Sequence, residues 1–324
     1  MPTRRFATAA LSLAASLLLA ACGNPSDGGT TEVAAKDGSR TKINLSADQK
    51  RITTPKVDSI AAQVPAEIRK RGTLEIVDSS DSAAPLTFYA TDNKTIIGVE
   101  PDLAYLVADV LGLEPHINTV SWENIFVGLD SGKYDVGFSN ITDTEERKEK
   151  YDFASYRKDD LAFETKKGSG LKVTGPKDVA GRTVAVDTGT NQEKLLVEWS
   201  EENVKAGREP VKIKYYQNQS DTYLALASGR IELFLGPSPT AAYHVASARQ
   251  TEIVGTYSGA GDTLQGLIAA TTKKDNGLVK ALNSAINEII DNGTYAKVLK
   301  RWGLSSEAVE KSEINPPGLP RTNK

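Results

Sequence analysis

The residues best suited to binding chemistry in this 324-residue sequence follow position 138. Hydrogen-bonding side chains precede a guanidinium there, in the order Ser139, Asn140, Thr142 and Arg147. A guanidinium can hold a carboxylate through two parallel hydrogen bonds, and burial strengthens such a pair. A charged run such as residues 145–150 is, however, equally typical of a solvated surface, so residue types alone leave both interpretations open.

A second candidate follows the β-branched run at residues 183–186, where a helix is predicted to begin. Thr190, Asn191 and Gln192 occupy this start. The first backbone N–H groups of a helix have no partner within the helix and therefore favour an anionic group. A simple helix cap explains the same residues equally well.

Short β-branched runs alternate with helical patterns from residue 72 onward. One helix opens at Pro101 and ends at Gly112, and a second is capped by Ser121. This alternation predicts an α/β fold with mainly parallel sheets. The predicted strands are 73–77, 134–138, 183–186 and 211–216, and a third helix covers 191–200.

One local pattern occurs twice. A helix end, a Ser-Gly-basic corner and an acidic residue within a strand occur around Ser131 and again around Ser228. The repeat suggests two similarly built lobes, although common supersecondary structure also produces such matches by chance.

Several short motifs, weak singly, together resemble the bacterial extracellular solute-binding proteins, family 3, which serve polar amino-acid ABC transporters. Their order and spacing match from about residue 72 to 303. The motifs lie at 98–104, 131–135, 139–153, 187–191, 228–230 and 292–302.

The resemblance implies a two-lobed periplasmic-binding-protein-like fold of type II, with two hinge strands crossing between the lobes. Lobe 1 would comprise residues 72–162 plus 258–303, lobe 2 residues 163–257, and a C-terminal tail residues 304–324. Ligand would sit in the interlobe cleft and favour the closed form.

The resemblance also assigns roles to the polar cluster. Arg147 would hold a ligand carboxylate, and Ser139, Asn140 and Thr142 would complete its hydrogen bonds. Trp122 matches an aromatic residue that covers the ligand in relatives, where a ring can attract a cation. Core packing is the alternative role for this tryptophan.

Two departures from the family pattern bear on the ligand. Relatives usually place an aspartate for the ligand's ammonium where Pro237 stands here, and an aromatic residue where Ala83 stands. A buried ammonium without a partner is costly. Either Asp81 or Asp187 compensates, or the ligand is not an ordinary α-amino acid.

The N-terminus predicts export. Arg4 and Arg5 precede an apolar run, and the ending Leu-Ala-Ala-Cys22 resembles a bacterial lipobox. We expect a signal peptide over residues 1–21, a lipidated Cys22, and a flexible tether to residue 71. The protein would then lie at the extracytoplasmic face of the cell membrane, anchored by lipid.

Composition excludes several classes. The formal charge is −3 with interspersed signs, which disfavours nucleic-acid binding. Cys22 is the single cysteine and only two histidines occur, so neither a disulfide framework nor a metal site is predicted. We expect no cofactor and a monomer that delivers an amino acid or analogue to an ABC permease and ATPase complex. The alternatives are a sensing subunit for a membrane receptor and a cleft enzyme of dehydratase type.

Overall fold

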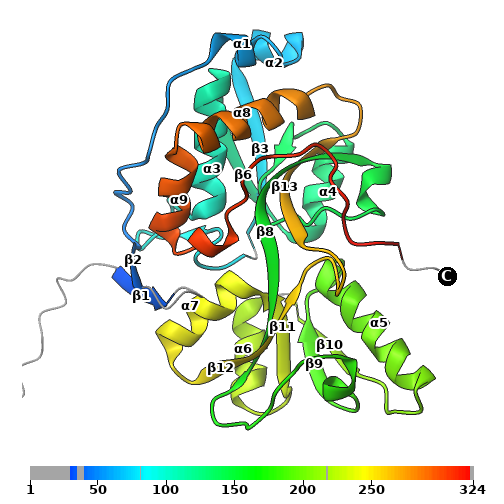
Figure 1. The fold of residues 1–324 in the computed structure, drawn as a ribbon. Coiled ribbons are helices and arrows are strands. Elements are labelled where there is room, and N and C mark those ends of the chain that lie inside the picture. The colour runs from blue at the N-terminus through cyan, green and yellow to red at the C-terminus, as the bar shows by residue number, and fades with distance from the viewer. Residues whose placement is uncertain (1–29, 35–39, 81, 217, 322–324) are drawn as a thin grey trace, which may run out of the picture.

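The computed structural model describes residues 30–34, 40–80, 82–216 and 218–321. The predicted signal peptide, Cys22 and Asp81 lie outside these residues. Two α/β lobes are stacked one above the other and share a continuous nine-stranded sheet (Figure 1).

Lobe 1 contains the sheet order β6-β3-β7-β13-β8. The strands β3, β6 and β7 are parallel, and β13 and β8 are antiparallel to their neighbours. Helices α3, α8 and α9 cover one side of the sheet and α4 covers the other (Figure 1). The elements are β3 (Thr73–Ser79), β4 (Phe88–Tyr89), β5 (Ile96–Ile97), α3 (Val99–Leu111), β6 (Glu114–Val120), α4 (Trp122–Asp130), β7 (Val136–Gly137), η1 (Arg147–Glu149), β8 (Tyr151–Lys166), β13 (Gly266–Lys273), α8 (Val279–Asp291) and α9 (Thr294–Trp302).

Lobe 2 repeats the plan with the order β10-β9-β11-β8, and β12 pairs with the free side of β8. Side chains alternate along β9. Val184 and Val186 face the core beneath α5, whereas Ala185 packs with Phe234 and Leu226 beneath α6. The elements are η2 (Pro176–Val179), β9 (Thr183–Val186), α5 (Asn191–Lys205), β10 (Lys212–Tyr215), α6 (Gln219–Ala227), β11 (Leu233–Pro237), α7 (Ser238–Ala248) and β12 (Thr251–Ser258).

Two segments cross between the lobes. Strand β8 pairs with β13 as far as Asp159, and its next residue, Asp160, pairs with Ser258 of β12. The chain returns through residues 258–266, which lie directly beside this point. The crossing strands expected from the resemblance are therefore β8 and the β12–β13 connection.

The repeated corners occupy equivalent places. Ser131 ends α4 and Ser228 ends α6, and the following Gly132 and Gly229 have φ angles of 71° and 74°. This left-handed conformation suits glycine and ends each helix before a central strand, β7 or β11. The prediction of two similar helix–turn–strand units is confirmed in geometry.

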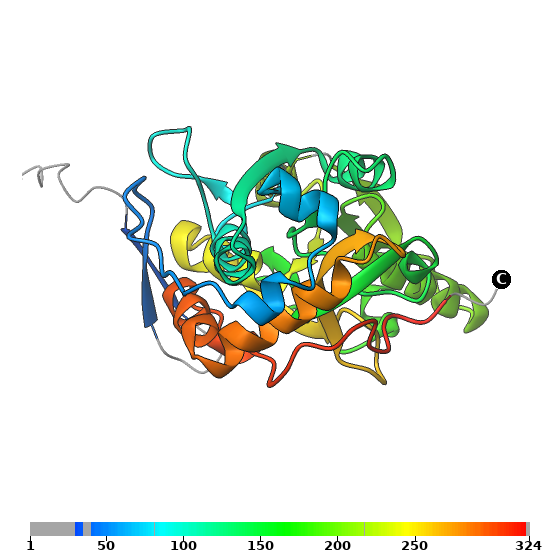
Figure 2. The same ribbon diagram turned by 90° about the horizontal axis from the view of Figure 1, so that it is seen from above.

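The expectation of a flexible tether to residue 71 is wrong for its described part. After β1 (Thr30–Ala34) and β2 (Arg40–Asn44), the chain runs along lobe 1 to α1 (Asp58–Ala61) and α2 (Ala66–Arg71) (Figure 2). Ile43 is fully buried in the lobe 1 core, and Arg51 pairs with Asp102 at 2.6 Å. A segment with few apolar residues cannot form its own core. Its single apolar residues can nevertheless dock on the core of a neighbouring lobe.

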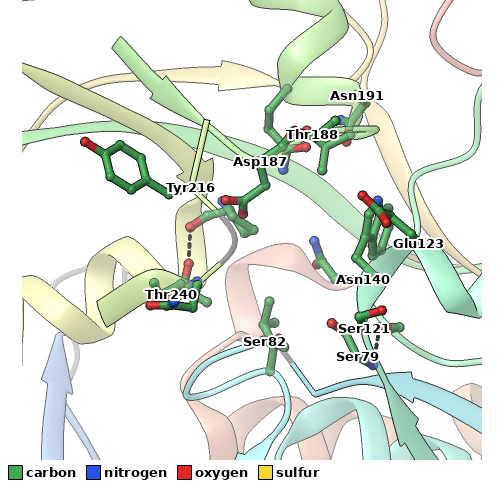
Figure 3. Close-up of a pocket in the computed structure, with 18 residues that line it drawn as sticks. Ser79, Ser82, Ser121, Glu123, Asn140, Asp187, Thr188, Asn191, Tyr216 and Thr240 are labelled. Atoms are coloured by element: carbon green, nitrogen blue, oxygen red, sulfur yellow. Dashed lines mark hydrogen bonds between the residues drawn. The ribbon is translucent and has the colours of Figure 1, made fainter. Parts of the chain in front are cut away.

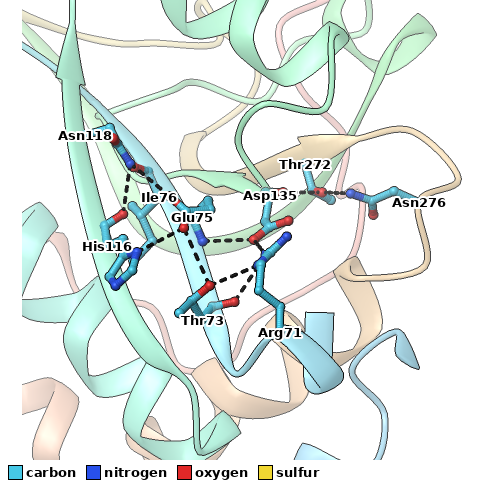
Figure 4. A network of polar contacts seen from close by, with 9 residues as sticks. All are labelled: Arg71, Thr73, Glu75, Ile76, His116, Asn118, Asp135, Thr272 and Asn276. Carbon is cyan, nitrogen blue, oxygen red and sulfur yellow. Dashed lines mark hydrogen bonds and ion pairs between the residues drawn. The ribbon is translucent and has the colours of Figure 1, made fainter. Parts of the chain in front are cut away.

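Polar contacts close the end of lobe 1 that lies opposite the interlobe face (Figure 4). Arg71 pairs with Asp135, and the Asp135 carboxylate accepts the backbone N–H of Glu75 at 2.8 Å. Glu75 in turn contacts His116 of β6 at 3.0 Å. These contacts hold the beginnings of the parallel strands together, which leaves the strand ends at the interlobe face for binding.

The C-terminal tail is extended and partly buried against both lobes. After η3 (Ser305–Glu307) it runs antiparallel to the lobe 1 part of β8 and then turns down toward lobe 2 (Figure 1, red), where Lys194 donates to the Pro320 carbonyl at 2.7 Å. Glu307 and Leu319 are nearly buried, and Leu319 belongs to the lobe 2 core. Within the part of the chain that the structure describes, no helix has the length and apolarity needed to cross a bilayer.

Candidate ligand-binding site

A cavity of about 420 Å³ lies between the lobes, where the central strands end (Figure 3). Lobe 1 lines it with the end of β3, the start of α4 and the loop after β7. Lobe 2 contributes the β9–α5 turn and the residues around the start of α7. Hydroxyl and amide side chains dominate the lining, as at Ser82, Ser121, Asn218 and Thr240. A polar cavity of this size suits a small metabolite.

The charged groups of the described lining are both acids. Glu123 comes from α4 and Asp187 from the end of β9, on opposite lobes. Acidic walls favour a ligand that carries a positive charge as well as any anionic group. Asp187, one of the two aspartates expected to compensate for Pro237, lines the cavity together with that proline.

Ser139 and Asn140 follow β7 and line the lobe 1 side of the cavity. Ser139 is buried, and its hydroxyl accepts the backbone N–H of Ser79 at 2.8 Å. Asn140 has a φ of 51°, a left-handed conformation that asparagine tolerates better than most residues. The turn after β7 therefore places both residues at the cavity.

Arg147 and Thr142 are not among the residues that line the cavity, and their direct contact with a ligand stays a prediction. Arg147 donates to the carbonyl oxygens of Thr142 at 2.9 Å and of Gly189, in lobe 2, at 3.1 Å. Burial lowers the pKa of Arg147 to about 10, an effect that Asp159 opposes. The guanidinium stays charged at neutral pH and ties lobe 1 to the β9–α5 turn.

Thr142 is engaged by a residue that sequence reasoning missed. Its hydroxyl donates to Asp159 at 2.8 Å, and the same carboxylate oxygen accepts from Asn191 at 2.9 Å. Burial raises the pKa of Asp159 despite these two hydrogen bonds. A Cβ atom on Gly259 would lie 1.7 Å from this carboxylate, so the second crossing can approach it only with glycine. Asp159 is a hydrogen-bonded bridge between the lobes.

The start of α5 reaches the cavity as predicted. Thr190, Asn191 and Gln192 all line it. The Thr190 hydroxyl accepts the backbone N–H of Glu193 at 3.2 Å, so this residue is also the helix cap. The cap satisfies the N–H group of Glu193. The backbone N–H groups of the two preceding helix residues lie at the cavity and remain available to an anion.

Trp122 lines the cavity and also spans the lobes. Its indole N–H donates to the Gly189 carbonyl at 3.4 Å, and its ring lies 5.4 Å from the Arg147 guanidinium. Gly189 has a φ of 74°, which favours glycine at this turn. Trp122 therefore lies at the cavity and packs against an arginine, and its covering of a ligand stays a prediction.

The comparisons with known proteins agree with this architecture. Residues 76–305 match the profile of the bacterial extracellular solute-binding proteins, family 3. This chain belongs to that family. Its two-lobed fold is that of the type II periplasmic binding proteins.

Similar proteins include binding proteins for two amino acids. The L-cystine-binding protein TcyJ of Escherichia coli is 30% identical over 73% of this chain and 84% of its own length. The arginine-binding protein ArgT of Corynebacterium glutamicum is 28% identical over 80% of this chain and 83% of its own.

Solved structures are similar over comparable lengths. An ancestral arginine-binding protein bound to arginine has a TM-score of 0.62 and 29% identity, covering 72% of this chain and 98% of its own. An ancestral amino acid-binding protein that is a precursor of cyclohexadienyl dehydratase has a TM-score of 0.61 and 28% identity, covering 73% of this chain and 97% of its own.

Proposed function

We propose that this solute-binding protein captures a small amino acid or amino-acid-like molecule outside the cell and delivers it to an ABC permease and ATPase complex. The supporting observation is the cavity between the lobes, to which lobe 1 contributes Ser139 and Asn140 and lobe 2 the start of α5. A ligand that contacts both lobes stabilises the closed form in proportion to its preference for that form. The permease would recognise the closed shape.

The ligand's carboxylate would lie between Asn140 and the first turn of α5, where donors from both lobes converge. Glu123 and Asp187 would face its cationic group. Arg147 contributes positive charge nearby and holds the Gly189 carbonyl, so it favours closure around the anion. Trp122 covers the site.

Arginine and cystine are the ligands in the names of similar proteins. Of the two, arginine suits acidic walls better, because its side chain adds a positive charge to the α-ammonium. We therefore propose L-arginine as the first ligand to test.

Cys22 would carry the lipid that keeps the protein at the extracytoplasmic membrane face, where it would work as a monomer. Mass spectrometry of the membrane-extracted protein tests this directly. A Cys22→Ser variant should then be released in soluble form, and retention of that variant in the membrane would contradict the anchor.

Binding without turnover is the proposed activity. A dehydratase needs a proton donor and acceptor aimed at one substrate carbon, whereas we propose that Glu123 and Asp187, which come from opposite lobes, face the cationic group of the ligand. Prolonged incubation with each bound ligand, followed by mass analysis, separates the two activities. Recovery of the unchanged ligand supports binding without turnover, and conversion of the ligand would contradict it.

The decisive experiment is native mass spectrometry of the mature protein, followed by tryptophan-fluorescence titration with amino acids and small amines. We expect one ligand per chain and a fluorescence change from Trp122, since it spans the lobes. Small-angle scattering should show compaction with the bound ligand. Binding without compaction would contradict the closure mechanism.

A further inference from the structure

A second arginine, Arg157, is buried in lobe 1 behind the cavity wall. Its side chain is 1% exposed and forms ion pairs with Glu100 of α3, at 2.8 Å, and with Glu307 of the C-terminal tail. Burial alone would lower the pKa of Arg157, but Glu307 and Glu100 together raise it above its usual value. The guanidinium is therefore a permanent buried cation with two carboxylate partners.

The same guanidinium holds Asn140. Its Nη2 atom, which bonds Glu100, also donates to Asn140 Oδ1. A guanidinium has donors and no acceptor, so the end of the amide that faces it must be the oxygen. The NH₂ end is then directed away from Arg157, and Figure 3 shows it pointing toward the open centre of the cavity. Asn140 thus presents a donor to the cavity.

Glu307 comes from outside the segment that matches the family, which ends at residue 305. Backbone and side-chain contacts dock the tail that carries it. The backbone N–H of Ser155 donates to the Glu313 carbonyl at 3.0 Å, and that of Asn315 donates to the Phe153 carbonyl at 2.9 Å. Both contacts run along β8, the strand that carries Arg157. The tail and Arg157 are therefore placed by the same strand.

We propose that the C-terminal tail is part of the ligand-recognition apparatus: Glu307 positions Arg157, and Arg157 orients the Asn140 amide as a donor to an acceptor oxygen of the ligand. Glu307 and Arg157 are positioning residues, because neither lines the cavity. This role refines the proposed function, because it assigns the carboxylate end of the ligand to Asn140. Only the predicted effect on ligand affinity rests on the proposed function.

A ligand-free measurement tests the orientation itself. The full mature chain is labelled with isotopic asparagine, and the Asn140 side-chain amide is assigned by its loss in Asn140→Ala. NMR relaxation should report a rigid amide in the native protein and a mobile one in Glu307→Ala. Glu307→Gln keeps an acceptor for Arg157 and should restore rigidity. Glu310→Ala removes an exposed tail carboxylate and serves as the control. An equally rigid Asn140 amide in Glu307→Ala would overturn the proposal.

Titration with L-arginine tests the consequence for binding. Glu307→Ala should weaken affinity by about tenfold or more, as expected for disturbing a hydrogen bond to a charged group, and Glu307→Gln should recover most of it. The loss should vanish in an Asn140→Ala background, because the two residues act through one contact. Additive losses would overturn the proposal. If L-arginine and other amino acids fail to bind while the NMR result holds, the proposed function fails and the positioning role stands.

Discussion

The two lobes present the same helix–turn–strand unit to the cavity but hold their binding groups differently. In lobe 1, Asn140 is held by Arg157, which is buried between two carboxylates. In lobe 2, the proposed binding groups are those of the first turn of α5, which Thr190 caps. Lobe 1 is therefore organised by a costly buried charge network, and lobe 2 by ordinary helix geometry.

This difference suggests a division of labour. All hydrogen bonds of a buried network can form in only one arrangement. Lobe 1 would therefore offer the ligand a rigid surface. The start of a helix binds an anion without a dedicated network. Under the proposed function, lobe 2 would close on a ligand that lobe 1 has already oriented. Arg147 and Asp159 join the two surfaces when the lobes meet.

The largest effect is expected from the charge at the centre of lobe 1. Arg157→Met should lower the free energy of unfolding by about 3–5 kcal/mol, because it leaves Glu100 and Glu307 buried without a cation. Urea denaturation measures it. The matched lobe 2 control is Arg182→Met, which removes the exposed pair with Glu232 and should cost less than about 1 kcal/mol. Equal losses would erase the contrast between the lobes.

The link between the lobes should come next. Arg147→Ala should weaken ligand binding by about 2 kcal/mol or more, since it removes a half-buried cation that bonds both lobes. Calorimetric titration with the amino acid identified in the binding screen measures it. Arg182→Ala, far from the cavity lining, is the control. Unchanged affinity in Arg147→Ala would remove this arginine from the binding mechanism.

The buried acids of lobe 1 predict a pH dependence. Burial, reinforced by Glu100, raises the pKa of Asp78 to about 8, and burial raises that of Glu307 to about 7. The folded protein thus holds protons that the unfolded chain releases near pH 4. Their contribution to stability is complete below that pH and is lost as the pH rises through about 7–8.

We therefore expect the free energy of unfolding to fall between about pH 5.5 and about pH 8.5 by at least about 1.4 kcal/mol, the equivalent of one pKa unit. Urea titrations at the two pH values measure it, and Asp78→Asn should flatten the slope. Asp92→Asn is the control, because hydrogen bonds from Thr95 lower the pKa of the exposed Asp92. Its contribution changes only in acid. A stability that rises over this interval would contradict the buried-acid account.

The smallest effect is expected in lobe 2. Thr190→Ala removes the cap of α5 and should cost about 1 kcal/mol of stability, with a few-fold loss of affinity measured by fluorescence titration. Thr190→Ser retains the hydroxyl and should behave as the native protein. A loss of affinity as large as that of Arg147→Ala would show that the start of α5 contributes to ligand binding as much as the arginine that joins the lobes.

Local signals were sufficient for most of the fold. The helix beginning near Pro101 and ending at Gly112, the strand at 183–186 and the Ser-Gly corners were all predicted, because periodicity and turn chemistry act over a few residues. The strand predicted at 134–138 is shorter, Val136–Gly137, because sheet pairing fixes its ends. The docking of residues 40–71 was missed, since it depends on the surface of lobe 1.

The candidate site was only partly visible in the sequence. Ser139, Asn140, Trp122 and the start of α5 line the cavity as expected. The displacement of Arg147 and Thr142 from the lining was not foreseen, because their partners lie in the other lobe and on β8. No local pattern marks Asp159 or Glu307 as special among the abundant acids of the chain.

The amino-acid sequence by itself determined the elements, the two repeated corners and the family, since each depends on neighbouring residues or on motifs in a characteristic order. Only the tertiary structure decided which polar groups face the cavity and which are consumed inside the protein. The physical reason is that a buried donor or acceptor must find a partner, and the partners of Arg147, Thr142 and Asn140 come from segments distant in the chain. Burial and pairing, rather than residue type, assigned their roles.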